Sequence, residues 1–168
     1  MSSTVEKSID VQVPINTAYN QWTQFEEFPR FMEGVREVKQ LNDKRLHWTA
    51  TVGGKEKQWE ADIVEQTHET RIAWRSATGA ENSGIVSFVP IEGGTRVTAR
   101  ITYDTEGLVE KAGDALGLVS RRVEGDLQRF KEFIESRGSE TGAWRGEIHA
   151  GKVKSGPGGA TSTGMGSE

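Results

Sequence analysis

Apolar residues recur at two different spacings along this chain, and the spacing changes after Tyr103. Up to that residue, apolar and polar positions mostly alternate, which is typical of strands with one buried face. From about Leu108 to Arg137 the apolar positions recur at steps of three and four, so this stretch predicts one long helix. The apolar stripe of that helix consists of Ala112, Leu116, Val119, Val123, Leu127, Phe130 and Ile134.

The alternating part of the chain predicts about seven strands in series. The first strand runs from Val5 to Val13 and ends at Pro14, and the second covers Val35 to Leu41. Gly53-Gly54 and Gly93-Gly94 each predict a tight hairpin turn between two later strands.

Two short helices are predicted between the first and second strands, over residues 17–23 and 27–32. Consecutive strands joined by short turns pair as antiparallel hairpins. Seven strands at about 4.8 Å spacing make a sheet about 30 Å wide, whereas a helix with its side chains is only about 10–12 Å across. We therefore expect an α+β fold in which the sheet curls around the long helix, the short helices plug one end, and an apolar hollow remains.

Four segments of the chain carry a resemblance to a known family: residues 22–35 followed by Val38, residues 72–76, residues 84–88 and residues 127–134. They resemble the polyketide cyclase/dehydrase and lipid-transport group, which includes coenzyme Q-binding proteins, within the START-like (SRPBCC) and pollen-allergen superfamily. The resemblance covers about Ser3 to Arg137 and implies the helix-grip fold, in which a curved antiparallel sheet wraps around a long C-terminal helix. Because this superfamily includes transporters, cyclases and hydrolases, the resemblance does not identify a ligand.

Aromatic residues dominate the predicted wall of the hollow. Strand parity places three tryptophans on the inward face together with one phenylalanine and one tyrosine, while two phenylalanines approach from the plug and three aliphatic residues from the helix. Each could simply fill the core, but the set suits a flat or long apolar ligand. The predicted ligand-binding residues are Phe28, Phe31, Trp48, Trp59, Trp74, Phe88, Tyr103, Leu116, Val119 and Val123.

Few residues that could perform chemistry are expected at the hollow. Parity places Lys57, Ser76 and Tyr103 inward, with either Arg36 or Glu37 depending on the register, and Tyr103 is the one candidate for a catalytic residue. The three histidines, His47, His68 and His149, lack the spacing of a metal site or a catalytic triad. We therefore expect no metal and no cofactor, and an enzyme on this scaffold would be a cyclase or dehydratase that works without a metal.

Composition and charge limit the partners and the cellular compartment that we expect for the protein. The net charge is -4 without a basic block, which argues against nucleic acid as a partner. The absence of cysteine fits a reducing compartment, and neither a signal core nor a membrane-spanning apolar run is present. We expect a cytoplasmic protein without stable membrane insertion.

The last 31 residues differ in composition from the rest. Residues 138–168 are rich in Gly, Ser and Thr, which predicts a flexible tail after a ligand-binding domain over residues 1–137. Trp144 and Ile148 interrupt this composition and either dock back on the domain or contact a protein partner.

Three functions are consistent with these observations. The leading hypothesis is the binding or carriage of a hydrophobic small molecule, polyketide-, quinone- or lipid-like, in an internal cavity. The first alternative is an aromatase/cyclase or dehydratase that acts on a polyketide-like substrate. The second alternative is a protein-interaction module that uses the tail around Trp144.

Overall fold

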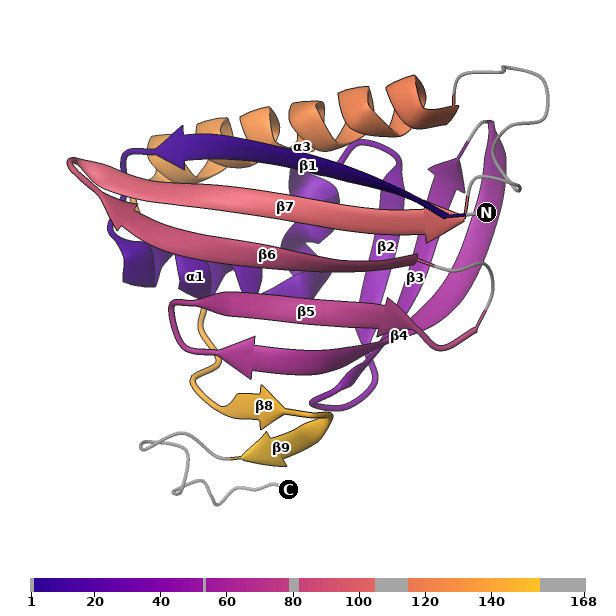
Figure 1. The fold of residues 1–168 in the computed structure, drawn as a ribbon. Coiled ribbons are helices and arrows are strands. Elements are labelled where there is room, and N and C mark those ends of the chain that lie inside the picture. The colour runs from indigo at the N-terminus through magenta and orange to yellow at the C-terminus, as the bar shows by residue number, and fades with distance from the viewer. Residues whose placement is uncertain (1, 53, 79–81, 105–114, 155–168) are drawn as a thin grey trace.

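A curved antiparallel sheet with one long helix packed against it organises the structure, a computed structural model (Figure 1). The structure describes residues 2–52, 54–78, 82–104 and 115–154. The strands are β1 (Ser2–Val11), β2 (Val35–Gln40), β3 (Arg45–Val52), β4 (Lys55–Thr67), β5 (Arg71–Ser76), β6 (Asn82–Ile91), β7 (Gly94–Asp104), β8 (Glu147–His149) and β9 (Lys152–Lys154). The helices are α1 (Ile15–Trp22), the 3-10 helix η1 (Phe25–Arg30) and α3 (Ala115–Arg137).

The sheet is curled by irregularities in two of its strands. Its main order is β1-β7-β6-β5-β4-β3-β2, with antiparallel pairing throughout. The register shifts between Ile63 and Glu65 in β4 and between Val35 and Glu37 in β2. Such bulges bend a strand and increase its twist. The first part of β4 pairs with β3 and its last part with β5, so the bend in β4 turns one half of the sheet toward the other.

The two halves of α3 meet different surroundings. In the second half, Leu127, Phe130 and Ile134 are buried. The ring of Phe130 lies 5.2 Å from that of Trp22 in α1 and 5.2 Å from that of Phe31, which follows η1. In the first half, Val119 and Val123 are only half-buried. The plug of short helices therefore fills the space beside one half of α3 and leaves space beside the other.

This architecture confirms the predicted α+β helix-grip fold, including the plug between the first two strands. Two details differ from the prediction. The described residues form nine strands rather than about seven, because β8 and β9 extend the sheet beyond the domain boundary expected at residue 137. The long helix is described from Ala115, so its predicted start at Leu108 lies outside the described residues.

The chain after α3 folds back onto the domain. Ile148 in β8 is fully buried and pairs with Gln66 of β4. The guanidinium of Arg145 donates to Asn20 Oδ1 at 2.7 Å and to Glu69 Oε2 at 2.8 Å, and it lies 5.7 Å from the centre of the Tyr19 ring. These contacts tie the segment to α1 and to the β4–β5 turn.

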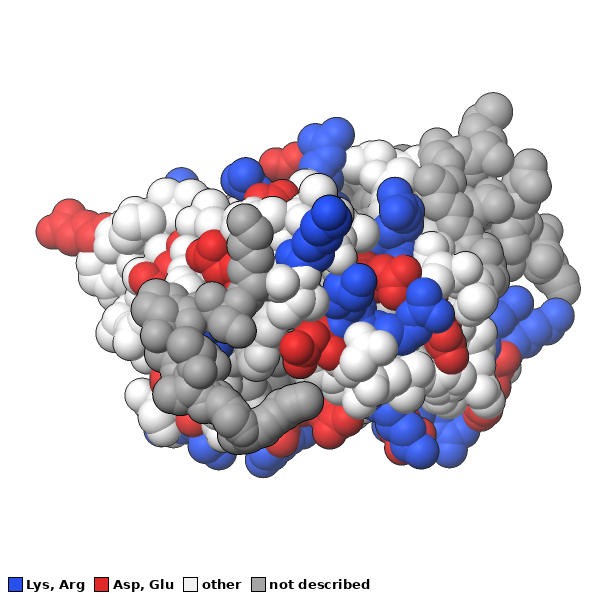
Figure 2. All heavy atoms as spheres, turned by 90° about the horizontal axis from the view of Figure 1, so that it is seen from below, with Lys and Arg blue, Asp and Glu red and all other residues white. Residues whose placement is uncertain are grey.

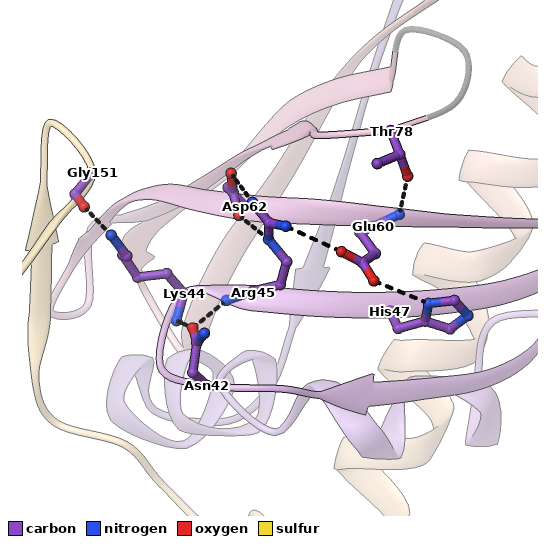
Figure 3. A network of polar contacts seen from close by, with 8 residues as sticks. All are labelled: Asn42, Lys44, Arg45, His47, Glu60, Asp62, Thr78 and Gly151. Carbon is purple, nitrogen blue, oxygen red and sulfur yellow. Dashed lines mark hydrogen bonds and ion pairs between the residues drawn. The ribbon is translucent and has the colours of Figure 1, made fainter. Parts of the chain in front are cut away.

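A polar network at β3 and β4 includes a contact with the turn between β8 and β9 (Figure 3). Arg45 in β3 donates from Nε to Asp62 Oδ1 at 2.7 Å and from Nη1 to Glu60 Oε1 at 3.1 Å, which joins the two strands through side chains as well as backbone. The adjacent Lys44 Nζ donates to the carbonyl of Gly151 at 2.9 Å. The β8–β9 hairpin is thus bound to the sheet at the turn that precedes β3.

The structure differs here from the prediction of a flexible tail over residues 138–168. Residues 138–154 belong to the folded domain, because the few apolar side chains in this Gly-rich stretch find buried places: Ile148 lies in the core and Trp144 packs against it. The rest of the predicted tail, residues 155–168, lies outside the described residues. Because Trp144 contacts its own domain, the structure gives no support to a partner-binding role for this side chain.

Charged side chains of both signs are mixed on one face of the molecule. In the face seen in Figure 2, Lys and Arg are interspersed with Asp and Glu, and neither sign gathers into one patch. Cross-strand pairs such as Asp10 with Arg96, 2.8 Å apart, follow the same pattern on β1 and β7. A search of the described helices finds none with the length and apolarity that a bilayer crossing requires.

We predict that Ile148→Ala lowers the free energy of unfolding by about 2–5 kcal/mol, because the lost side chain leaves a cavity in the core. The matched control is Val153→Ala, since Val153 pairs with Ile148 across the hairpin but is 39% exposed. Urea denaturation should show a much smaller change for the control. Equal and small changes for both variants would contradict the docking of this segment.

Candidate functional site

The space beside the first half of α3 forms a cavity of about 220 Å³. The β-strands contribute most of its wall, namely Val35, Leu46, Trp48, Ala50, Trp59, Ile63, Ile72, Trp74, Asn82, Val86, Ala99 and Ile101. The plug and the residues after it close one side with Trp22, Phe25, Phe28, Met32 and Glu33. Helix α3 contributes Arg122, Val123, Asp126 and Leu127.

Flat aromatic surfaces form much of this wall. Trp48 and Trp59 are directly opposite in the β3–β4 register, and their rings stack with centres 5.9 Å apart and planes within 6°. Phe28 from η1 lies 5.8 Å from Trp48 and continues this aromatic surface. Offset stacking of large rings in this way stabilises a rigid wall.

Trp74 owes its position to a glycine on the next strand. Trp74 of β5 pairs with Gly84 of β6, and a Cβ atom added to Gly84 would come within 2.5 Å of the Trp74 ring. The absence of a side chain at Gly84 lets the indole of Trp74 lie against the neighbouring strand, where it forms part of the cavity wall. This pair helps to keep the cavity open.

Five of the ten predicted ligand-binding residues line the cavity: Phe28, Trp48, Trp59, Trp74 and Val123. The side chain of Leu116 lies outside the described residues. The other predicted residues, Phe31, Phe88, Tyr103 and Val119, do not line it.

The misplaced aromatics belong to the core. Phe31 is enclosed by the rings of Phe130 and Phe133, at 5.2 and 5.4 Å, and Phe88 packs edge-on against Tyr19 of α1 at 5.5 Å. Tyr103 is 5% exposed near the end of β7; it is not among the residues that line the cavity, although its neighbours Ile101 and Asn82 are. Parity correctly indicates the buried face of a strand, but it does not indicate where along that face the plug covers it.

Four polar residues at the cavity were not predicted: Glu33, Asn82, Arg122 and Asp126. Two of them follow from the helix pattern. Arg122 and Asp126 each precede a residue of the apolar stripe and are four positions apart, so they lie on the flank of the stripe. The sequence therefore did contain a signal for these two residues, namely their position beside the apolar stripe of a helix that was expected to border a cavity.

Asp126 is held in a defined position between the helix and the plug. Its Oδ1 accepts the backbone N–H of Glu33 at 3.1 Å and the Nη2 of Arg129 at 2.5 Å. The side chain is 18% exposed, and this burial raises the pKa of the Asp126 carboxyl above its ordinary value, although the hydrogen bond and charge of Arg129 act in the opposite direction. Asp126 is therefore the cavity residue best suited to keep or release a proton.

Arg129 and Arg122 have different roles although both lie on the same helix. Arg129 donates to the carbonyl of Phe31 at 3.0 Å and lies 3.5 Å from Glu33 Oε1, so it is occupied by several acceptors. Arg122 lies against the backbone of Gly34. Within the described part of the chain, the guanidinium of Arg122 forms no hydrogen bond or ion pair, although its charge acts on Asp126 and lowers the pKa of that carboxyl.

The site does not resemble a metal centre. Among residues 2–52, 54–78, 82–104 and 115–154, no three His, Asp or Glu side chains come close enough together to hold a metal ion. Its chemistry is that of an apolar, aromatic cavity with one carboxyl group and one guanidinium on the side of α3.

The fold and the cavity define a helix-grip protein of the START-like kind with an apolar cavity beside its long helix. Residues 11–132 match the family model described as polyketide cyclase / dehydrase and lipid transport, and the chain belongs to this family. An uncharacterized 17.2 kDa protein from the melC2-rnhH intergenic region of Streptomyces lincolnensis is 48% identical over 148 residues, which are 87% of this chain and 99% of that protein.

Solved structures show the same fold. The protein DR_A0006 from Deinococcus radiodurans is 32% identical, with a TM-score of 0.64 over 80% of this chain and 99% of the other. A START superfamily protein from Mycobacterium smegmatis has a TM-score of 0.70 at 14% identity, over 80% and 98% of the two chains. The Zhui aromatase/cyclase from Streptomyces sp. R1128 has a TM-score of 0.68 at 16% identity, over 82% and 96%.

We predict that a carbon-detected NMR titration places the pKa of Asp126 above the ordinary value of about 3.9. Arg129→Gln should raise this pKa further, because it removes a hydrogen bond and a positive charge that favour the ionised form. Glu135 on the same helix is the control, since its hydrogen bond from Lys131 lowers its pKa. A pKa of Asp126 below the ordinary value would contradict this account of the site.

Proposed function

We propose that this protein binds or carries a flat hydrophobic small molecule, polyketide-, quinone- or lipid-like, in the cavity beside α3. The observation that supports this most directly is an apolar cavity of about 220 Å³ with rigid aromatic walls. An apolar cavity of about 150 Å³ is large enough to bind benzene in another protein. The present volume therefore suits a body of about two fused rings, with longer chains extending from it.

The apolar wall can supply the affinity without a charged anchor. A ligand that buries about 300 Å² of apolar surface gains roughly 7 kcal/mol before ordering costs. Membership of a family whose description includes lipid transport agrees with this kind of ligand.

The test uses a neutral two-ring probe, 2-(2-naphthyl)ethanol, with isothermal titration calorimetry. We expect one saturable site with a Kd on the order of 10–100 μM. Ala99→Leu, which adds three carbons to the cavity wall, should weaken binding by about tenfold or more. Thr98→Leu on the same strand is the control, because Thr98 faces outward and bonds Ser8 Oγ at 2.8 Å. Absence of saturable binding to the unmodified protein would refute the proposal.

Catalysis as an aromatase/cyclase or dehydratase is a second candidate, and the position of Asp126 favours it. A carboxyl with a raised pKa at the wall of an apolar cavity can transfer a proton to or from an enolisable carbonyl, and a neighbouring guanidinium can polarise the carbonyl oxygen. The family description includes cyclases and dehydrases, and the fold is shared with an aromatase/cyclase.

For this second candidate we expect Asp126→Asn to reduce turnover of a short linear poly-β-ketone by about 10²–10⁴-fold, as loss of a general acid or base does. Product formation is followed by liquid chromatography with mass spectrometry. The control is Tyr103→Phe, which removes the hydroxyl of the catalytic candidate indicated by sequence, a residue that is not part of the cavity lining. Cyclisation at the uncatalysed rate with the unmodified protein would exclude the enzyme and leave the binding proposal intact.

A further inference from the structure

We infer that the ligand of this cavity carries one acidic oxygen group, a carboxylate or an ionised enol or phenol, and that Arg122 binds it at the α3 side of the cavity. This inference rests on the proposed binding function. It adds a class of ligand and a specificity-determining residue to that function.

The first observation is the position of Arg122. The residue belongs to the cavity wall and is half-buried, and its Nη1 lies directly over Gly34. A Cβ atom on Gly34 would overlap this nitrogen, and the φ angle of +90° at Gly34 also favours glycine. The loop between η1 and β2 is thus shaped to let the guanidinium lie at the cavity.

The second observation is the distribution of hydrogen bonds around the site. The two carboxylates nearby, Asp126 and Glu33, are both engaged by Arg129, and Asp126 also accepts the Glu33 N–H. No such contact involves the donors of Arg122 in the part of the chain that the structure describes. An arginine presents five N–H donors in a planar fork, so Arg122 retains its capacity to bind an acceptor.

The third observation concerns the local charge. Arg129 pairs with Asp126 at 2.5 Å, and the Glu33 side chain is 70% exposed, so solvent screens its charge. The charge of Arg122 also acts on Asp126 and lowers the pKa of its carboxyl, but within the described residues the two side chains form no hydrogen bond or ion pair. Among the described residues of the cavity wall, Arg122 is the one lysine or arginine, and the wall around it is mainly apolar. A planar guanidinium binds a carboxylate through two parallel hydrogen bonds, which fixes both the charge and the orientation of the bound group.

These features together predict an amphiphilic ligand. The aromatic wall formed by Trp48, Trp59 and Trp74 would cover its ring system, and Arg122 would bind its acidic oxygen from the opposite element. A ligand of this kind would bind in one orientation. A purely apolar ligand would gain nothing from Arg122.

The experiment compares two probes with the same naphthalene body, 2-naphthylacetic acid and 2-(2-naphthyl)ethanol. Isothermal titration calorimetry at pH 7.5 in low salt measures both on the unmodified full-length protein and on each variant. We expect the acid to bind about tenfold more tightly than the alcohol to the unmodified protein. Added salt should reduce this preference, because an exposed edge of the ion pair is screened.

Substitutions of Arg122 test whether this residue causes the preference for the acid. Arg122→Gln should bring the ratio of the two dissociation constants to within about twofold of one, and Arg122→Lys should leave an intermediate ratio because it keeps the charge but loses the fork. Arg121→Gln is the matched control, since Arg121 is the exposed neighbour on the same helix and should keep the full ratio.

The possible outcomes distinguish failure of the role of Arg122 from failure of the proposed binding function. If both probes bind the unmodified protein with equal affinity, or if Arg122→Gln keeps the preference for the acid, the role of Arg122 is refuted and the binding function stands. If neither probe binds, the proposed function itself fails. A variant that does not fold is recognised by circular dichroism, and the conservative Arg122→Lys then carries the test.

Discussion

The structure depends on one geometric constraint, which is that a single helix must cover the inner face of a sheet wider than itself. The bulges in β4 and β2 bend the sheet around α3, but bending alone does not bring every strand into contact with one helix. The plug formed by α1 and η1 fills the space beside Leu127, Phe130 and Ile134. Beside Val123 no other described helix is inserted, and the cavity lies there.

An apolar space of this kind persists only if its walls cannot collapse into it. Trp48 and Trp59 stabilise each other by stacking, and Trp74 lies against the glycine of the adjacent strand. Large rings held in this way keep their positions without contacts from the cavity side. On the other side of the bulge in β4, the hairpin with Ile148 completes the sheet, so the bent strand is supported at both ends. The rigidity of the cavity thus follows from contacts outside it.

Much of this arrangement could be predicted from the sequence, because periodicity reports which face of an element is buried. The strand series, the long helix and the inward tryptophans followed from that signal alone. The distinction between Phe28, which lines the cavity, and Phe88, which packs on Tyr19, could not follow from it, since both lie on buried faces. The β8–β9 hairpin was also not predicted, because a Gly-rich composition concealed one well-placed isoleucine.

The polar side of the cavity explains why two different functions remain consistent with one geometry. Arg129 binds the carboxylates of Asp126 and Glu33 and so fixes the junction between α3 and the plug. This leaves Arg122 available to bind an acceptor, which is all that a carrier of an acidic ligand requires. Catalysis requires in addition that Asp126 exchanges a proton with the ligand, and burial shifts its pKa in the direction that makes this easier near neutral pH. A carrier and a cyclase on this scaffold would therefore differ not in the aromatic wall but in how firmly Arg129 holds the carboxyl group of Asp126.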